Sequence, residues 1–249
     1  MRKLYFEKLD KIIVVKDNDH KHISQILRSK IGDNFTVVCG NNHDYIYTIS
    51  DITRNETVLK YVSKQKNRVE PNINITLFSP PLKGDKNETV IRSCTELGIK
   101  SFCPIITDFV AARKESYKVD RLQKIALEAL KQSGRSSLPK VHEIVKFSQM
   151  LVKLKDFDLV VFLYEEAGDK DIKTFLREKF ADSRGGCPHP PVSNIAIIVG
   201  GEGGFSKAEV ELLKKQNATP ITLGTRILRA DTAAITACSL VLYEAGEMS

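Results

Sequence analysis

Two arginines near the C-terminus have the spacing and the surroundings that favour chemistry. Arg226 and Arg229 flank two apolar residues, and an almost uncharged helix is predicted from Asp231 onward. An arginine at such a position can form a structural salt bridge. Because the guanidinium group stays protonated and offers a planar set of donors, it also suits a phosphate or a base edge. In a basic chain, and close to a ligand-binding loop, contact with phosphate or base is the favoured interpretation.

A glycine-rich stretch about 22 residues upstream is the expected ligand loop. Gly200-Gly-Glu-Gly-Gly204 follows an apolar run and precedes a helix that opens with a capping box, Ser206 to Glu209. Glycine lets the main chain approach a ligand closely. The stretch is not a dinucleotide fingerprint, because Ser206 stands where the last glycine would be, and no P-loop pattern follows. Alone it is equally consistent with a tight structural turn, but the two stretches together predict a small ligand held by main-chain groups.

Length and charge limit the class of protein. The 249 residues, of which 42% are hydrophobic, can bury a sizeable core in one or two domains. The net charge is +7, and the segment 111–155 holds 11 basic and 4 acidic residues. A local basic excess favours a polyanion such as RNA or DNA as partner, and a solvated basic face without a partner is the alternative.

The cysteines and histidines indicate neither a disulfide framework nor a metal site. The 5 cysteines are odd in number and never in C-x-x-C spacing, and the 5 histidines show no ligand pattern. The first residues contain no long apolar run, and no stretch reaches the length of a membrane span. We therefore expect no metal, no signal peptide and no membrane span, and a cytoplasmic location.

Residues 1–70 are expected to form a small β-barrel-like domain. Runs rich in β-branched and aromatic residues predict strands, and one run with helical spacing predicts a helix. The strands are expected at Asn34–Val38, Tyr45–Ser50 and Thr57–Ser63, and the helix at His22–Ser29. The polar, proline-containing stretch 64–72 is the predicted linker.

Residues 71–249 are expected to form an α/β domain, because buried strands alternate with helices. The strands are predicted at Ile73–Ser79, Lys100–Ile106, Asp158–Leu163, Ile195–Val199 and Pro220–Leu223. The helices are predicted at Asn87–Leu97, Asp120–Ser133, 206–216 and Asp231–Ala245, with Gly98 and Gly134 ending the first two. The stretch Ala181–Asn194 is expected to be a loop.

Three further features each allow two interpretations. Arg92 and Glu96 lie four residues apart on a predicted helix, where an exposed ion pair is the simplest interpretation. Arg135 follows an amphipathic helix, so it could interact with the helix C-terminus or, in a basic segment, with phosphate. The uncharged stretch Ala233–Tyr243 is expected to serve both as core and as part of a subunit interface.

Several groups of residues, in order along nearly the whole chain, carry a family resemblance. They are His22–Arg28 with Gly32 and Asp33, Lys83–Lys86, Thr95–Ile99, Glu128–Arg135 with Pro139, Gly203–Ser206 with Glu209, and Leu223–Gly224 with Arg226–Arg229 and Thr232–Ala234. On these residues the chain resembles the bacterial 16S rRNA uridine-N3 methyltransferases of the SPOUT superfamily. It departs from their usual pattern at Gly201 and Thr225, where proline is common, and at Asp231, where glutamate is usual.

The resemblance implies a PUA-like RNA-binding domain at 1–70 and a SPOUT-type α/β methyltransferase domain with a trefoil knot at 71–249. It also implies a homodimer that acts on 16S rRNA of the small ribosomal subunit with S-adenosylmethionine as cofactor. The residues expected to hold the cofactor are Leu163, Tyr164, Glu165, Val199, Gly200, Gly201, Glu202, Gly203, Gly204, Leu223, Gly224, Arg226, Ile227 and Leu228. RNA contacts are expected at Arg28, Lys83, Lys131 and Arg135.

Methylation at N3 of uridine removes a weakly acidic imide proton, so the site must stabilise an anion and accept a proton. Arg229, together with Arg92, is the expected anion stabiliser, since arginine is a poor base. Asp231 or Glu96 is the expected proton acceptor. Two alternatives stay open: a non-catalytic RNA-binding protein of ribosome assembly, and a SPOUT enzyme that methylates the ribose 2′-hydroxyl of tRNA.

Overall fold

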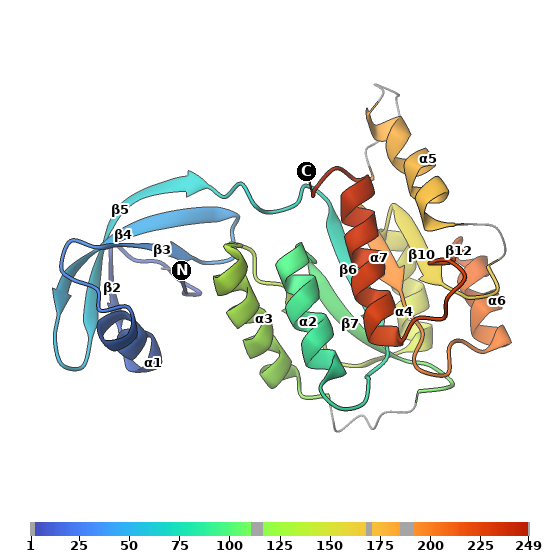
Figure 1. Ribbon diagram of the computed structural model, residues 1–249, viewed down its shortest axis with the longest axis horizontal. Helices are drawn as coiled ribbons and strands as arrows, with labels where there is room; N and C mark the ends of the chain where they lie inside the picture. The colour runs from blue at the N-terminus through green and yellow to red at the C-terminus, as the bar shows by residue number, and fades with distance from the viewer. Residues whose placement is uncertain (1–2, 111–116, 168–170, 185–191, 249) are drawn as a thin grey trace. The chain divides into compact units, whose positions relative to one another are not determined.

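The computed structural model describes residues 3–110, 117–167, 171–184 and 192–248. Its contacts divide the chain into two compact units (Figure 1). The N-terminal unit comprises Met1–Glu70 with Leu127–Leu138, and the C-terminal unit comprises Pro71–Ala126 with Pro139–Ser249. Helix α3 (Val119–Ser133) therefore begins in the C-terminal unit and ends in the N-terminal one, which a linear division of the sequence at residue 70 does not anticipate.

The N-terminal unit is built on a five-stranded sheet with the order β1-β3-β4-β5-β2. Its strands are β1 (Lys3–Tyr5), β2 (Ile12–Val15), β3 (Asn34–Val38), β4 (His43–Ile52) and β5 (Thr57–Lys66). Neighbouring strands are antiparallel, apart from the parallel pair of β1 and β3. Because β1 and β2 are the edges of this order, the sheet is a curled half-barrel and not a closed barrel.

One face of this sheet and the helical segment bury a common core. Its members are Leu4, Ile13, Val15, Ile23, Phe35, Val37, Tyr47, Ile49 and Leu59. The helix differs from the prediction at His22–Ser29: α1 covers Asp17–Lys21 and continues as a π-helix over His22–Ile26. The spacing of apolar residues correctly predicts that Ile23 is buried on a helix. It does not predict the first turn, because all the residues of that turn are polar.

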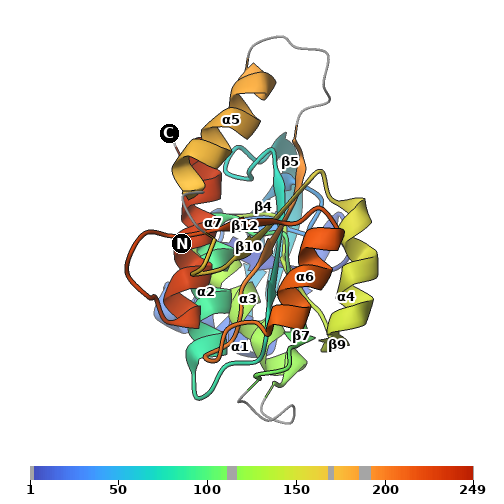
Figure 2. The ribbon, with the colours of Figure 1, turned by 90° about the vertical axis from the view of Figure 1, so that its right-hand side faces the viewer.

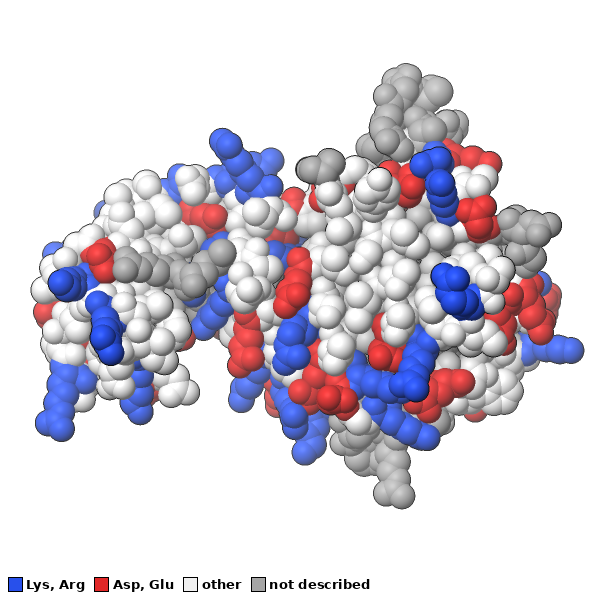
Figure 3. Space-filling view, viewed as in Figure 1, with Lys and Arg blue, Asp and Glu red and all other residues white. Residues whose placement is uncertain are grey.

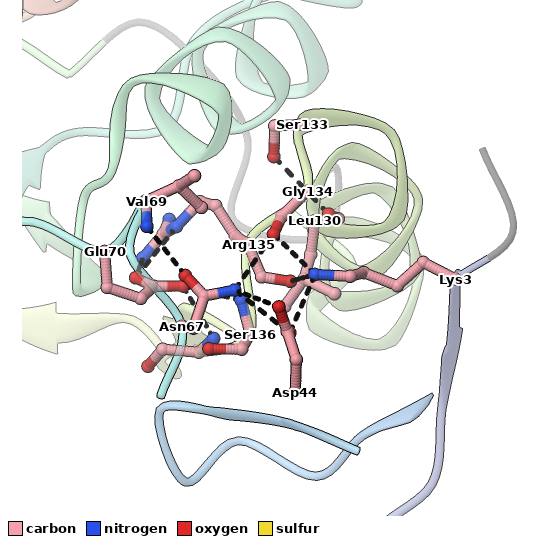
Figure 4. Close-up of polar contacts among 11 residues, drawn as sticks. Lys3, Asp44, Asn67, Val69, Glu70, Leu130, Ser133, Gly134, Arg135 and Ser136 are labelled. Carbon is pink, nitrogen blue, oxygen red and sulfur yellow. Dashed lines mark hydrogen bonds and ion pairs between the residues drawn. The ribbon is translucent and has the colours of Figure 1, made fainter. Parts of the chain in front are cut away.

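A buried polar network ties the backbone that follows α3 to the strands of the N-terminal unit (Figure 4). The Lys3 ammonium donates to the Asp44 carboxylate at 3.0 Å and to the carbonyl oxygens of Gly134 and Arg135 at 2.5 and 3.2 Å. The Asn67 side chain donates to both Asp44 oxygens at 3.0 Å and to the Gly134 carbonyl at 3.2 Å. The chain just beyond α3 is thereby held by Lys3 and Asn67, which lie far from it in the sequence.

The Glu70–Arg135 ion pair completes the network. One Glu70 oxygen accepts from Arg135 Nε at 3.1 Å and from Nη2 at 2.8 Å, and the other accepts from the backbone N–H groups of Ser136 and Ser137 at 2.7 and 2.8 Å. The side chains of Arg135 and Glu70 are only 2% and 5% exposed. The structure thus contradicts the prediction that Arg135 contacts RNA, because its guanidinium group is buried and already bound to a carboxylate.

We predict that Arg135→Ala lowers the free energy of unfolding by about 3–5 kcal/mol, because it leaves the buried Glu70 carboxylate without its cation. Urea denaturation followed by circular dichroism measures the change. Lys214→Ala is the matched control, since the Lys214–Glu211 pair lies on the surface at 3.0 Å, and its loss should cost no more than about 1 kcal/mol. Equal losses in the two variants would contradict a structural role for Arg135.

The C-terminal unit is built on a parallel sheet with the order β12-β10-β11-β6-β7-β8, and β9 also pairs with β7. Its strands are β6 (Asn74–Ser79), β7 (Ser101–Ile106), β8 (Lys140–Val141), β9 (Val145–Lys146), β10 (Leu159–Leu163), β11 (Asn194–Ile198) and β12 (Thr219–Ile221). The apolar runs of β10 and β11 are buried because helices cover both faces of a parallel sheet. The α/β class expected from the alternation is confirmed.

Figure 2 shows how helices cover the two faces of this sheet. On one side lie α2 (Lys86–Leu97), α5 (Ile172–Arg184) and α7 (Ala230–Glu244), and on the other lie α4 (Phe147–Lys153) and α6 (Lys207–Lys215). Helix α7 packs against both α2 and α5. No helix in the described ranges is long and apolar enough to cross a membrane. The trefoil knot that the resemblance implies stays a prediction.

Two helices were not predicted. Helix α5 has apolar residues at helical spacing from Ile172 to Phe180, and the Asp171 carboxylate accepts from the Thr174 N–H at 2.9 Å at its start. The expected loop Ala181–Asn194 is wrong at its beginning, where residues 181–184 continue α5, and at its end, where Asn194 begins β11. Residues 185–191 lie outside the described ranges. Helix α4 is shorter than two full turns, too short for its periodicity to stand out.

Candidate active site

Three neighbouring strands deliver three loops to one edge of the parallel sheet. β12, β10 and β11 are adjacent and parallel, so the loops that follow them leave from the same carboxyl edge. These loops surround a pocket of about 1070 Å³, which is at the upper end of the range for small-molecule sites. The order of the strands therefore brings three loops that are distant in the sequence together around one pocket.

The pocket brings together all the residues that the resemblance implies for cofactor binding. The ranges 163–165, 199–204 and 223–228 line it, and Arg229 lines it with them. Residues that were not expected also contribute: Lys86, Phe205, Ile221, Thr222, Ala230 and Ala233. Of these, Lys86 is the one cation. It belongs to the stretch Lys83–Lys86 that carries the family resemblance, in which a ligand contact is predicted for Lys83 alone.

The glycine loop is a close-packed turn in which a side chain would not fit. The Gly204 N–H donates to the Gly201 carbonyl at 3.0 Å, and Gly204 has a φ of 70°, which favours glycine. A Cβ atom added to Gly203 would lie 2.8 Å from the Cβ of Phe109, and one added to Gly200 would lie 3.1 Å from the backbone of Gly204. The main chain can therefore line the pocket directly.

A capping box fixes the end of this loop and confirms the predicted start of α6. The Ser206 hydroxyl accepts from the Glu209 N–H at 3.2 Å, and the Glu209 carboxylate accepts from the Ser206 N–H at 2.9 Å. The second Glu209 oxygen accepts from the Asp108 N–H at 2.9 Å, and Ser206 Oγ donates to the Asp108 carboxylate at 2.6 Å. Glu209 is buried, so its bonds are partly shielded from solvent, whereas the bond between Ser206 and Asp108 is exposed.

Glu202, at the tip of the glycine loop, faces two lysines. Its carboxylate lies 2.9 Å from Lys86 Nζ and 3.7 Å from Lys83 Nζ. The hydrogen bond and charge of Lys86, with a smaller effect of Lys83, hold the pKa of Glu202 below its ordinary value. The structure thus places Lys83 close to the pocket, and its contact with RNA stays a prediction.

The arginine loop carries two exposed cations at the pocket. Thr222 Oγ1 donates to the Gly224 carbonyl at 3.0 Å, and Gly224 has a φ of 105°. Arg226 and Arg229 are both exposed, and Ile227 is 85% exposed although it is apolar. A side chain of this kind at a pocket wall can cover an apolar part of a ligand.

Arg229 and Asp231 stand together at the start of α7. Arg229 is the N-cap residue, and its carbonyl accepts from the Ala233 N–H at 2.8 Å while its side chain makes no capping bond. Asp231 is half-buried in the first turn, and its Oδ1 atom has no hydrogen-bond partner within the described residues. A buried carboxylate oxygen without a partner is uncommon, and a role in the reaction is one of the explanations for it.

Arg229 lines the pocket, whereas Asp231 and the other predicted catalytic and RNA-binding residues do not. Arg92 and Glu96 are exposed on α2 and do not line it. In the N-terminal unit, Arg28 is exposed with a φ of 49°, and Lys131 forms an ion pair with Asp19 at 3.0 Å. Their roles stay predictions. A search of the described residues found no group of three or more histidine, cysteine or acidic side chains placed to hold a metal ion.

Comparison with known proteins identifies the family. The sequence model of the RNA methyltransferase domain matches residues 69–242, and that of the RNA methyltransferase PUA domain matches residues 15–60. The ribosomal RNA small subunit methyltransferase E of Bacillus subtilis (strain 168) is 32% identical over 232 residues, covering 90% of this chain and 86% of the relative. The protein of the same name from Rickettsia conorii is also 32% identical, with 93% and 89% covered.

Solved structures agree with this fold. A Legionella pneumophila protein, solved with the cofactor SAM bound, is 26% identical and superposes with a TM-score of 0.80 over 97% of both chains. A ribosomal RNA small subunit methyltransferase E from Neisseria gonorrhoeae has a TM-score of 0.82 over 98% of this chain and 97% of its own, at 24% identity. The predicted fold class and family are confirmed, and the chain belongs to the ribosomal RNA small subunit methyltransferase E family.

Proposed function

We propose that the protein transfers a methyl group from S-adenosylmethionine (SAM) to N3 of one uridine in 16S rRNA, acting in the cytoplasm as a homodimer. The observation that carries this proposal is the convergence of three main-chain loops on one pocket, with Arg229 and the first turn of α7 beside it. Family membership supports rRNA of the small subunit as substrate. In this proposal residues 1–70 contribute to rRNA binding, and residues 71–249 carry the catalysis.

The residues of the pocket fit the cofactor. Main-chain groups of the three loops offer donors and acceptors for an adenosine and an amino acid, and Leu163, Val199 and Leu228 offer apolar walls. The missing Cβ of Gly203 leaves room for the loop to keep its compact turn. The SAM bound to the Legionella pneumophila relative supports the same ligand here. When bound, the cofactor supplies an electrophilic methyl group.

The residues at the start of α7 can supply the remaining chemistry. Uridine N3 becomes nucleophilic when it loses its proton, and the negative charge spreads to the neighbouring carbonyl oxygens. The Arg229 guanidinium group, exposed at the pocket, can donate to such an oxygen and stabilise the anion. Asp231 Oδ1, for which the described residues offer no hydrogen-bond partner, can accept the proton, directly or through water.

Helix α7 also supports the proposed homodimer. One face of it is buried in the unit, while Ile235, Thr236, Ser239 and Leu240 are partly exposed and Tyr243 is 64% exposed. These residues form a continuous uncharged stripe, because they recur at helical spacing. An uncharged stripe on a packed helix suits the same stripe of a second chain related by a two-fold axis. The exposed Arg92 on the neighbouring α2 could then serve the partner's site.

The function itself is tested by nucleoside analysis. Purified protein, SAM and 16S rRNA or small subunits from a strain that lacks the gene should yield 3-methyluridine at one position, detected by mass spectrometry of the digested rRNA. Methylation of tRNA ribose instead would support the 2′-hydroxyl enzyme. SAM binding without methylation of either RNA, or no SAM binding at all, would overturn the proposed reaction.

Gly203→Val should abolish cofactor binding while the protein stays folded, because the new side chain would drive the glycine loop away from Phe109. Isothermal titration calorimetry with SAM measures the affinity. Gly203→Ala tests whether the clash with Phe109 causes the loss of SAM binding, because its Cβ would lie 2.8 Å from the Cβ of Phe109. Adding Phe109→Gly removes that contact and should restore part of the affinity. An unchanged affinity in Gly203→Val would refute the assignment of this loop.

Arg229→Ala should slow methylation by about a hundredfold or more and leave SAM affinity nearly unchanged, since the lost interaction forms only with the developing anion. Arg229→Lys should recover part of the rate, because lysine keeps the charge but lacks the planar donors. Single-turnover assays at saturating substrates measure the rate. Arg177→Ala, which removes an exposed arginine from α5, is the control and should be neutral. A normal saturated rate with weakened SAM binding would make Arg229 a binding residue.

Leu240→Glu should convert the homodimer to a monomer, because it places a charge in the middle of the uncharged stripe of α7. Light scattering coupled to gel filtration gives the mass in solution. Leu212→Glu, at an exposed leucine on α6, is the matched control and should leave the mass unchanged. A wild-type protein that is already monomeric would overturn the dimer without affecting the proposed reaction.

A further inference from the structure

One face of β4 and β5 carries a row of aromatic and basic side chains. Directly opposite residues of an antiparallel pair point to the same face, and so do alternate residues along one strand. Three opposite pairs make up the row, and we name them the β4–β5 platform: His43 with Lys66, Tyr45 with Lys64, and Tyr47 with Tyr61. A β-bulge at Val62 shifts the register by one residue. The paired side chains before and after the bulge therefore still point to the same face of the sheet.

The inner end of the platform is anchored in the core. Tyr47 is buried, and its hydroxyl donates to the Asp10 carbonyl at 2.8 Å. Its ring packs edge-on against the ring of Tyr61, with centroids 5.7 Å apart and an interplanar angle of 76°. Tyr61 is itself 41% exposed, so the row passes from core to solvent at this pair.

The outer end of the platform is open and its rings are held in place. Lys64 and Lys66 are exposed, and His43 and Tyr45 are half-buried. Asn41 fixes both rings: its carbonyl lies 2.9 Å from His43 Nδ1, and its side-chain amide donates to the Tyr45 hydroxyl at 2.6 Å. Rings that are already oriented lose little conformational freedom when they bind a ligand.

The charges around the platform favour an anionic partner. Asp44 lies between His43 and Tyr45 but points to the opposite face, where it is bound by Lys3 and Asn67. Asp44 is therefore paired on the other face of the sheet and not with the two lysines of the row. Figure 3 shows lysine and arginine side chains projecting from the N-terminal unit, on the left of the view.

We propose that the β4–β5 platform binds a single-stranded part of the rRNA substrate. Bases stack on the open faces of Tyr61 and Tyr45, and the phosphates between them contact Lys64 and Lys66. Aromatic rings spaced with cations recognise unpaired nucleotides in this way, because every base has a face that can stack. A duplex offers no such faces, since its bases are already stacked on one another. The proposal rests on the proposed function, which requires rRNA as the substrate.

Lys64 and Lys60 lie on the same strand and give a matched pair of variants. Lys64 belongs to the platform, whereas Lys60 lies opposite Thr48 and points to the other face of β5. The full-length protein is titrated with a labelled, uridine-rich single-stranded RNA of about ten nucleotides. Lys64→Gln should lower the affinity several-fold and make the dependence of log Kd on log salt shallower by about 0.7, one phosphate contact. Lys60→Gln removes the same charge and should leave both quantities nearly unchanged.

Tyrosine variants test the stacking separately. Tyr61→Leu should weaken the binding of single-stranded RNA by about tenfold, whereas Tyr61→Phe keeps the ring and should bind nearly as well as the wild type. Urea denaturation identifies any variant that has lost its fold, and Tyr61→Phe keeps the test decisive if Tyr61→Leu is unstable. In methylation assays, Lys64→Gln should raise the KM for rRNA and leave kcat at saturating rRNA unchanged.

The outcomes separate the platform from the enzyme's function. If the wild type methylates rRNA but Lys64→Gln and Lys60→Gln behave alike, the platform is wrong and the proposed function stands. If Lys64→Gln weakens binding to an RNA duplex as much as to the single strand, the single-strand assignment is overturned. If the wild type methylates no rRNA, the proposed function fails, whichever RNA the platform binds.

Discussion

The site depends on one constraint, namely that β12, β10 and β11 are adjacent and parallel. Only in this order do the loops after the three strands meet at one edge, although up to about 60 residues separate them along the chain. Each loop has its own support, such as the capping box of Ser206 and Glu209 or the bond from Thr222 to Gly224. The strand order determines where the pocket lies, and the local bonds determine its walls.

Positive charge in this protein has two separate uses. Arg135 and Lys3 are buried and hold the backbone after α3 against the strands of the N-terminal unit. Arg229, Lys64 and Lys66 are exposed, and the bonds and ion pairs described for the chain leave them available for a ligand. A basic excess counted along the segment 111–155 therefore overstates the charge available to RNA, since part of it is neutralised by carboxylates brought in from residues 1–70. Burial and pairing must be known before charge can be converted into a binding surface.

Patterns that repeat along the sequence predicted most of the fold. The strands β6, β7, β10, β11 and β12, the helix α2 with Gly98 at its end, and the capping box of α6 all have signals within a few residues. The burial of Arg135 has no such signal, because its partner Glu70 lies 65 residues away. The same holds for Lys86, which lines the pocket only because the start of α2 meets the glycine loop. Local periodicity identifies elements, while contacts between distant residues decide what an individual side chain does.

The departures from the family's usual residues can be weighed in the same way. Where proline is common, this chain has Gly201, and a Cβ added there would lie 3.2 Å from Cγ of Pro80. The loop after β6 thus fills space that a larger residue at 201 would need, and the turn is held by the bond between Gly204 and Gly201. Asp231 is one methylene shorter than glutamate, so its carboxylate stays closer to the first turn of α7. Its Oδ1, which has no hydrogen-bond partner within the described residues, lies two residues from Arg229, so the cation and the carboxylate proposed for the reaction belong to the same end of one helix.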